Sequence, residues 1–145
     1  MVTNTQMAGG EVTPRLTSEL LRLLDEVLDT IEKVEIAWHL ACSRAPLRIS
    51  ELQEKALLDP RAMRAAIDEL VRARVVELAR KPVATVRLGP RARHADFESL
   101  MSRYAVDRPV VAAALTSIAM TRIRAMTMRA FSEAFVQRSK KGDPT

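Results

Sequence analysis

Basic side chains recur at helical spacing between Asp59 and Pro82, where they could bind an anionic partner. One face of a helix predicted in this stretch carries Arg61, Arg64, Ala65, Asp68 and Arg72. A guanidinium group donates a fixed pair of hydrogen bonds, which fits phosphate oxygens as well as O6 and N7 of guanine. Arg61 or Arg64 would reach guanine in a major groove, Ala65 would allow close approach, and Arg72 would meet a phosphate. The chemistry that this face indicates is DNA binding.

The same face has a second interpretation, in which its charges only keep a helix soluble. Asp68 stands four residues from both Arg64 and Arg72, a spacing that allows ion pairs along one helix. Arg80 and Lys81 follow at the tip of a predicted hairpin. There they could straddle a phosphate backbone or enter a minor groove, although turns are often charged without a function. The residues by themselves leave both interpretations open.

Other residue types that support chemistry lack the partners that a reaction needs. His39 and Cys42 are three apart on a predicted helix, but two ligands do not complete a metal site. Cys42 is the only cysteine, which excludes an intramolecular disulfide and favours a reducing, cytoplasmic setting. We find no glycine-rich phosphate loop and no nucleophile motif beside a histidine and an acid. We therefore expect no enzyme activity, no cofactor and no metal site.

Composition predicts a mainly helical chain that forms one domain with a tail or an oligomerisation segment. Of its 145 residues 48% are hydrophobic and 3% aromatic, so the core is built mostly from aliphatic side chains. Residues 1–14 are polar, lack the pattern of a secretory signal and are expected to be a disordered leader. No uninterrupted run approaches the ~18 apolar residues that cross a bilayer, so we expect no membrane span.

Charge is unevenly distributed along the chain. Residues 1–78 hold 10 Lys and Arg against 13 Asp and Glu, a net charge of −3, whereas residues 79–145 hold 13 against 5, a net charge of +8. A positive field over the second half suits DNA, an anionic membrane surface or an acidic protein equally well.

The basic residues are placed by a predicted series of short elements. A leucine-rich helix begins after Ser18, and a helix that is apolar on most sides begins after Asp29 or Thr30 and ends before Pro46. Arg48 and Ile49 can form a very short strand, and Ser50 with Gln53 resembles a capping box for the next helix. The helix after Asp59 has Pro60 in its first turn and turns an apolar row inward, namely Met63, Ile67, Leu70 and Val71.

Two β-branched runs, VVEL and VATVRL, then predict a hairpin that Gly89-Pro90 ends. Helix, strand, helix, turn, helix and hairpin is the order of a winged helix-turn-helix, so we predict such a domain, with its leading helix, over residues 15–90. The fold class expected is mainly α, with a small β-hairpin wing and additional N- and C-terminal helices. Residues 91–138 are predicted to be a C-terminal helical dimerisation or partner segment, and residues 139–145 a frayed tail.

Several of these segments resemble known proteins. The block DTIEKVEI at 29–36, SELQ, and PRAMRAAIDELVRARVVEL are similar to bacterial winged-helix regulators of the broad MarR/PadR type. DTIEKVEI together with FSEAF at 131–135 resembles a set of small bacterial winged-helix proteins. The resemblance covers roughly residues 20–137 and implies a winged-helix fold. Recognition helices of such regulators usually offer Ser, Thr, Asn or Gln beside Arg, and this face departs from that pattern with only Arg, Ala and acid.

The C-terminal segment is expected to cover apolar stripes by pairing with a second copy. The residues predicted to contact a partner are Val111, Leu115, Ile118, Met128, Phe131 and Phe135. A ligand pocket between dimerisation helices, an adaptable protein-binding groove and a membrane-surface helix are the alternatives. The function expected is a homodimeric regulator that binds two half-sites on double-stranded DNA. The alternative is a non-catalytic winged-helix adaptor that binds a protein partner through its C-terminal helix.

Overall fold

The protein, seen here as a computed structural model that describes residues 15–141, is mainly helical. Over these residues six α-helices and one short 3₁₀ helix accompany a small antiparallel sheet, which confirms the predicted mainly α class. The predicted leader and the last residues of the predicted tail, 142–145, lie outside the described residues. The elements are α2 (Ser18–Glu26), α3 (Ile31–Ser43), β1 (Leu47–Arg48), α4 (Ile49–Ala56), α5 (Pro60–Arg72), β2 (Val76–Ala79), β3 (Thr85–Leu88), η1 (Pro90–Arg93), α6 (Ala95–Val106) and α7 (Arg108–Lys141).

The start of α2 differs from prediction, whereas the start of α3 confirms one of the two predicted caps. Thr17, not Ser18, caps α2, because its hydroxyl accepts the amide hydrogen of Leu20. Thr30 caps α3 by accepting from Lys33. Asp29, the other candidate, instead binds the side chain of Lys33. The structure thus assigns each cap to a threonine.

The start of α4 also differs from prediction. The helix begins at Ile49 rather than after Ser50, and the Glu51 carboxylate accepts the backbone amide of Arg48 at 2.8 Å. Gln53 has no part in the cap. The helix begins here because Arg48, paired with Thr85 of β3, is the last residue of strand β1.

The sheet has three strands in the order β1-β3-β2, all antiparallel. Val86 of β3 stands opposite both Leu47 of β1 and Leu78 of β2 and is buried. Helix α3 lies at the centre of the domain and contacts α4, α5, α6 and β3. Its apolar sides are therefore covered by these four elements, as the sequence predicts for a central helix.

The hydrophobic core continues beyond residue 90, where the sequence analysis placed a boundary. Phe97, Leu100 and Tyr104 of α6 are buried in the same cluster as the leucines of α2 and α3. Val111 and Leu115 of α7 join this cluster, with 0% and 7% of their surface exposed. These two predicted partner residues are thus core residues of the single chain, because α2 and α6 already cover the first turns of α7.

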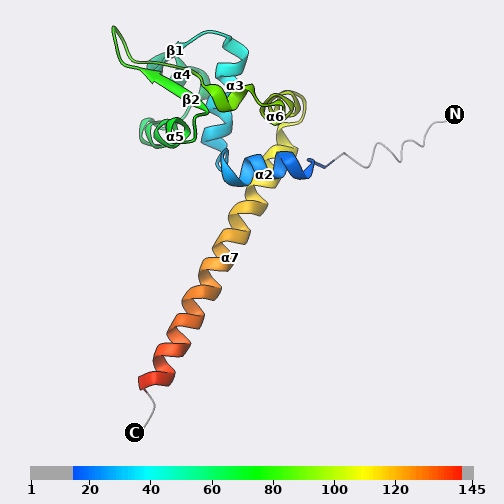
Figure 1. The fold of residues 1–145 in the computed structure, drawn as a ribbon, viewed down its shortest axis with the longest axis vertical. Coiled ribbons are helices and arrows are strands. Elements are labelled where there is room, and N and C mark those ends of the chain that lie inside the picture. The colour runs from blue at the N-terminus through cyan, green and yellow to red at the C-terminus, as the bar shows by residue number, and fades with distance from the viewer. Residues whose placement is uncertain (1–14, 142–145) are drawn as a thin grey trace, which may run out of the picture.

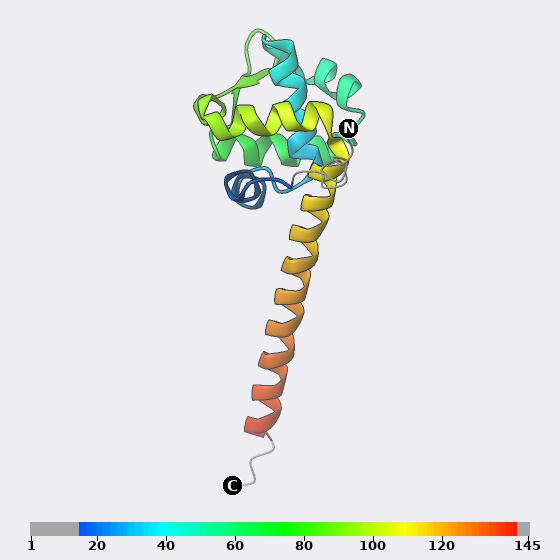
Figure 2. The same cartoon turned by 90° about the vertical axis from the view of Figure 1, so that its right-hand side faces the viewer.

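Beyond these turns α7 extends away from the domain as a long single helix (Figures 1 and 2). It reaches Lys141, three residues past the end predicted near Arg138. By length and composition its Arg108–Arg138 part is long and apolar enough to cross a membrane. One such helix is weak evidence for a span, and its first turns pack on the domain. The absence of a membrane span stays a prediction.

Candidate nucleic-acid interface

Helix α5 is positioned by strong local signals and by one apolar face. The Asp59 carboxylate accepts the backbone amides of Arg61 and Ala62 at 3.0 and 3.1 Å, and Pro60 occupies the first turn, where no amide hydrogen is needed. The buried residues of the helix are Met63, Ala66, Ile67 and Leu70. Val71, predicted to point inward, is 37% exposed because it lies at the edge of this face. The opposite face is left to solvent.

The predicted DNA-binding residues of α5 occupy that solvent face together. Arg61, Arg64, Ala65, Asp68 and Arg72 are all exposed. The predicted ion pairs of Asp68 with Arg64 and Arg72 are not formed among the described residues. The small side chain of Ala65 leaves a shallow hollow of about 380 Å³ lined by Pro60, Arg61, Arg64 and Asp68. The guanidinium groups are thus available to an external anion.

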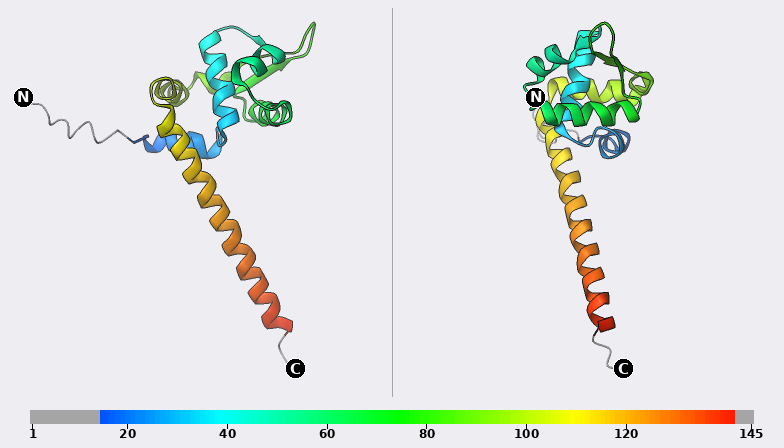
Figure 3. Two further views of the ribbon diagram at one scale, coloured as in Figure 1. Left: turned by 180° about the vertical axis from the view of Figure 1, so that it is seen from behind. Right: turned by 90° about the vertical axis from the view of Figure 1, so that its left-hand side faces the viewer.

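The β2–β3 hairpin brings the second predicted pair to the same side of the domain. Arg80 and Lys81 lie in the loop between the strands and are exposed. The hairpin tip and α5 lie on one side of α3, and α6 lies on the other (Figures 1 and 3). The structure therefore brings the α5 face and the hairpin pair, separated in sequence, to one side of the protein.

Three acidic residues near this surface are held by neighbouring donors, whereas Asp68 on the α5 face has no ion pair among the described residues. Glu69 of α5 binds the ammonium of Lys33. Glu77 on β2 accepts from Arg87 on β3 at 2.8 Å. Glu51 accepts a backbone amide at the start of α4. These contacts reduce the repulsion that the acidic N-terminal half would exert on a polyanion.

A buried lysine links α5 to the long C-terminal helix, which sequence reasoning missed. Lys33 is 7% exposed and binds Asp29 at 2.6 Å as well as Glu69. Burial alone lowers the pKa of Lys33, but its hydrogen bonds with both carboxylates raise the pKa above its ordinary value. Asp29 also accepts from Arg122 of α7 at 2.6 Å. The available signal was one lysine within the apolar stretch from Ile31 to Ala41.

His39 and Cys42, three residues apart on α3, have different surroundings in the structure. His39 has its Nε2 3.3 Å from the Glu35 carboxylate, and Cys42 is exposed. Glu35 also accepts from Tyr104 and from Arg108. Within residues 15–141 no three His, Cys, Asp or Glu side chains group as metal ligands. This polar cluster joins α3 to the junction of α6 and α7.

The predicted partner residues of α7 separate into two groups. Val111 and Leu115 are buried inside the chain, and Ile118 is half-buried at the wall of a groove. Met128, Phe131 and Phe135 are exposed on the extended part of the helix. Only the latter group is fully open to another molecule.

No family model, curated protein or solved structure matches this chain. Function is therefore inferred from the residues of the two surfaces above.

Proposed function

We propose that this protein is a cytoplasmic, homodimeric regulator of transcription that binds double-stranded DNA through a winged helix-turn-helix. In this proposal α4 and α5, joined by the turn at 57–59, form the helix-turn-helix, and the β2–β3 hairpin is the wing. The observation that carries the proposal is the arginine face of α5, exposed on the same side of the domain as the basic hairpin tip.

Helix α5 lies in the major groove in this mechanism. Its N-terminal arginines, Arg61 and Arg64, approach base edges, and Arg72 contacts a phosphate. Arg80 and Lys81 contact the backbone or the neighbouring minor groove. The face offers no Ser, Thr, Asn or Gln, so backbone contacts dominate affinity and binding depends steeply on salt.

Fluorescence anisotropy with labelled random duplex, beginning at about 50 mM salt, tests the proposal. Replacing Arg80 and Lys81 together with alanine removes two phosphate contacts. The slope of log affinity against log salt should then fall by up to about 2. Arg64→Ala should weaken binding by about 1–3 kcal/mol.

Arg129→Ala is the matched control, because Arg129 is an exposed arginine on the extended part of α7, far from α5 and the hairpin. It should leave the anisotropy curve unchanged. Absence of duplex binding by the unmodified protein at about 50 mM salt, or equal losses in Arg64→Ala and Arg129→Ala, would overturn DNA binding through this surface.

A second candidate function is supported by the exposed methionines and phenylalanines of α7. A non-catalytic adaptor would bind a protein partner with this surface, since thioether side chains adapt to varied shapes. A pull-down partner that is lost on deletion of residues 120–138, and retained after nuclease treatment, would favour the adaptor over the regulator.

A further inference from the structure

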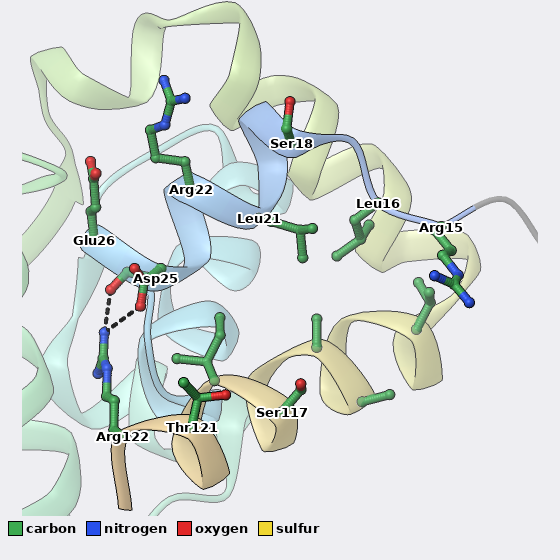
Figure 4. A pocket seen from close by; sticks show the side chains of 14 residues that line it. Arg15, Leu16, Ser18, Leu21, Arg22, Asp25, Glu26, Ser117, Thr121 and Arg122 are labelled. Carbon is green, nitrogen blue, oxygen red and sulfur yellow. Dashed lines mark hydrogen bonds and ion pairs between the residues drawn. The ribbon is translucent and has the colours of Figure 1, made fainter. Parts of the chain in front are cut away.

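Helices α2 and α7 enclose a groove on the surface of the domain. Its volume is about 840 Å³, and it is lined from α2 by residues that include Leu21 and Asp25 and from α7 by Val110, Ala114 and Ser117. Figure 4 shows Leu21 between the two helices, with Ser117 and Thr121 along the α7 wall. Small side chains on α7 leave this space open, and no described segment of the same chain fills it.

The α7 wall of the groove continues along the helix as one stripe. Residues at alternating spacings of four and three share a helix face. This spacing joins the groove to the exposed tip through Val110, Ala114, Ser117, Thr121, Arg124, Met128, Phe131 and Phe135. The stripe begins with small residues at the domain and ends with large apolar ones that no described residue covers.

We propose that the groove is filled by α7 of a second copy, packed antiparallel about a two-fold axis, with Phe131 and Phe135 of each copy seated in the groove of the other. An antiparallel register with its axis between Arg122 and Ile123 matches the stripe with itself. It sets Phe135 against Val110, Phe131 against Ala114, Met128 against Ser117, and Arg124 against Thr121. Each pair joins a large side chain to a smaller one, which is the complementarity that close packing requires.

Charges agree with the same register. Arg124 of one copy reaches the level of Thr121 in the other, where Glu26 lines the groove beside Asp25, which already pairs with Arg122 of its own chain. Arg138, the next residue of the stripe, reaches the level of Asp107. A basic side chain thus meets Glu26 at the middle of the paired helices and Asp107, which also pairs with Arg103 of its own chain, at their end, which favours this alignment over a slipped one.

The exposed apolar surface of α7 also favours burial against a second copy. An aromatic side chain has roughly 200 Å² of surface. Phe131 and Phe135 are 70% and 65% exposed, so together they leave roughly 270 Å² uncovered on each copy. Met128 and the groove walls add to this area, and the two-fold axis uses every contact twice. The exposed apolar surface thus supplies part of the ~800 Å² that each partner buries in a standard interface.

This inference shares with the proposed function only the homodimer. It also determines how far apart the two domains lie along α7. The offset from Val110 to Phe135 corresponds to about 37 Å along the helix axis. The two domains would be separated along α7 by close to the ~34 Å of one DNA turn.

Cysteine cross-linking tests the register without DNA. In a Cys42→Ser background, Ala114→Cys protein mixed with Phe131→Cys protein should form a mixed disulfide under mild oxidation. Ala112→Cys mixed with Glu133→Cys is the control, because these positions lie at the same level but off the stripe, and it should not cross-link. A parallel pair would instead join Ala114→Cys to itself, which would overturn the antiparallel register.

Light scattering on the full chain measures the oligomeric state and so tests which face of α7 forms the dimer. Phe131→Glu should convert the dimer to a monomer, whereas Met126→Glu should leave it a dimer. Met126 is a fair control because it is 63% exposed and lies about 140° around the helix from Phe131. A monomeric unmodified protein, or dissociation by Met126→Glu alone, would overturn the inference. A monomer that still bound duplex DNA would leave the DNA-binding proposal standing.

Discussion

The ammonium group of Lys33, in the first turn of the central helix α3, lies 2.6 Å from the carboxylate of Asp29, which precedes that helix. The same ammonium binds Glu69 of α5, and the same carboxylate binds Arg122 of α7. One chain of charges therefore ties the candidate DNA-binding helix to the helix proposed to pair two copies. Lys33 and Asp29 can be altered without touching either surface, whereas Arg122 itself lines the groove between α2 and α7.

Lys33→Met should destabilise the protein by about 1–3 kcal/mol, because Glu69 loses its partner and Asp29 loses one of two. Urea unfolding followed by circular dichroism measures the change. Lys55→Met, on the exposed side of α4, should change the free energy of unfolding by less than about 0.5 kcal/mol. Equal effects of the two substitutions would show that the buried contacts contribute nothing specific.

Stability should fall at both extremes of pH. Burial raises the pKa of Asp29, but hydrogen bonds from Lys33 and Arg122 bring it below its ordinary value of 3.8. The stability that Asp29 contributes is present above that value and is lost as the pH falls through the lower folded-state pKa. Lys33 has a raised folded-state pKa, so its contribution is complete below 10.5 and is lost as the pH rises through that pKa.

Urea midpoints measured across pH check this expectation. In Asp29→Asn the acid-side loss should be smaller than in the unmodified protein, because that variant no longer has the carboxylate to protonate. An unchanged acid limb would contradict the role given to Asp29.

Arg108→Ala should loosen the junction between the domain and α7. The Arg108 guanidinium lies 4.6 Å from the ring centre of Trp38 and 4.9 Å from that of Tyr104, and it donates to Glu35 at 3.2 Å. Loss of these contacts should cost about 1–2 kcal/mol. Trp38 is the only tryptophan, so its fluorescence reports the change directly. Arg129→Ala should leave the emission spectrum unaltered, and an unaltered spectrum in Arg108→Ala would argue against the ring contacts.

Gly89→Ala should destabilise the end of the hairpin. A Cβ atom at Gly89 would lie 2.8 Å from the backbone carbonyl oxygen of Arg74, closer than real Cβ contacts allow. The Gly89 amide donates to Val75 at 2.7 Å, so the backbone cannot move away without losing a hydrogen bond. We expect a loss of about 1–3 kcal/mol in urea unfolding. Val83→Ala in the exposed hairpin loop is the control and should be nearly neutral.

Features that depend on neighbouring residues were predictable. Asp59, Pro60 and the spacing of Met63, Ile67 and Leu70 predicted the start of α5 and its buried face, and both are confirmed. The hairpin was predicted from its β-branched runs and the intervening turn, and strands β2 and β3 confirm it. These signals act over three or four residues or across one turn, so they can be read from neighbouring residues in the sequence.

Contacts between distant segments were decided only by the tertiary structure. By sequence Thr30 and Asp29 were equal candidates for the cap of α3. In the structure Lys33 and Arg122 bind the Asp29 carboxylate, and Thr30 is the cap. Val111 and Leu115 had the same apolar character as Phe131 and Phe135, yet only the first two are covered by α2 and α6. The sequence by itself determined where the elements form and which faces are apolar. The fold alone decided which of those faces are buried and which acid each buried base meets, because burial and ion pairing depend on distances between segments that chain order does not specify.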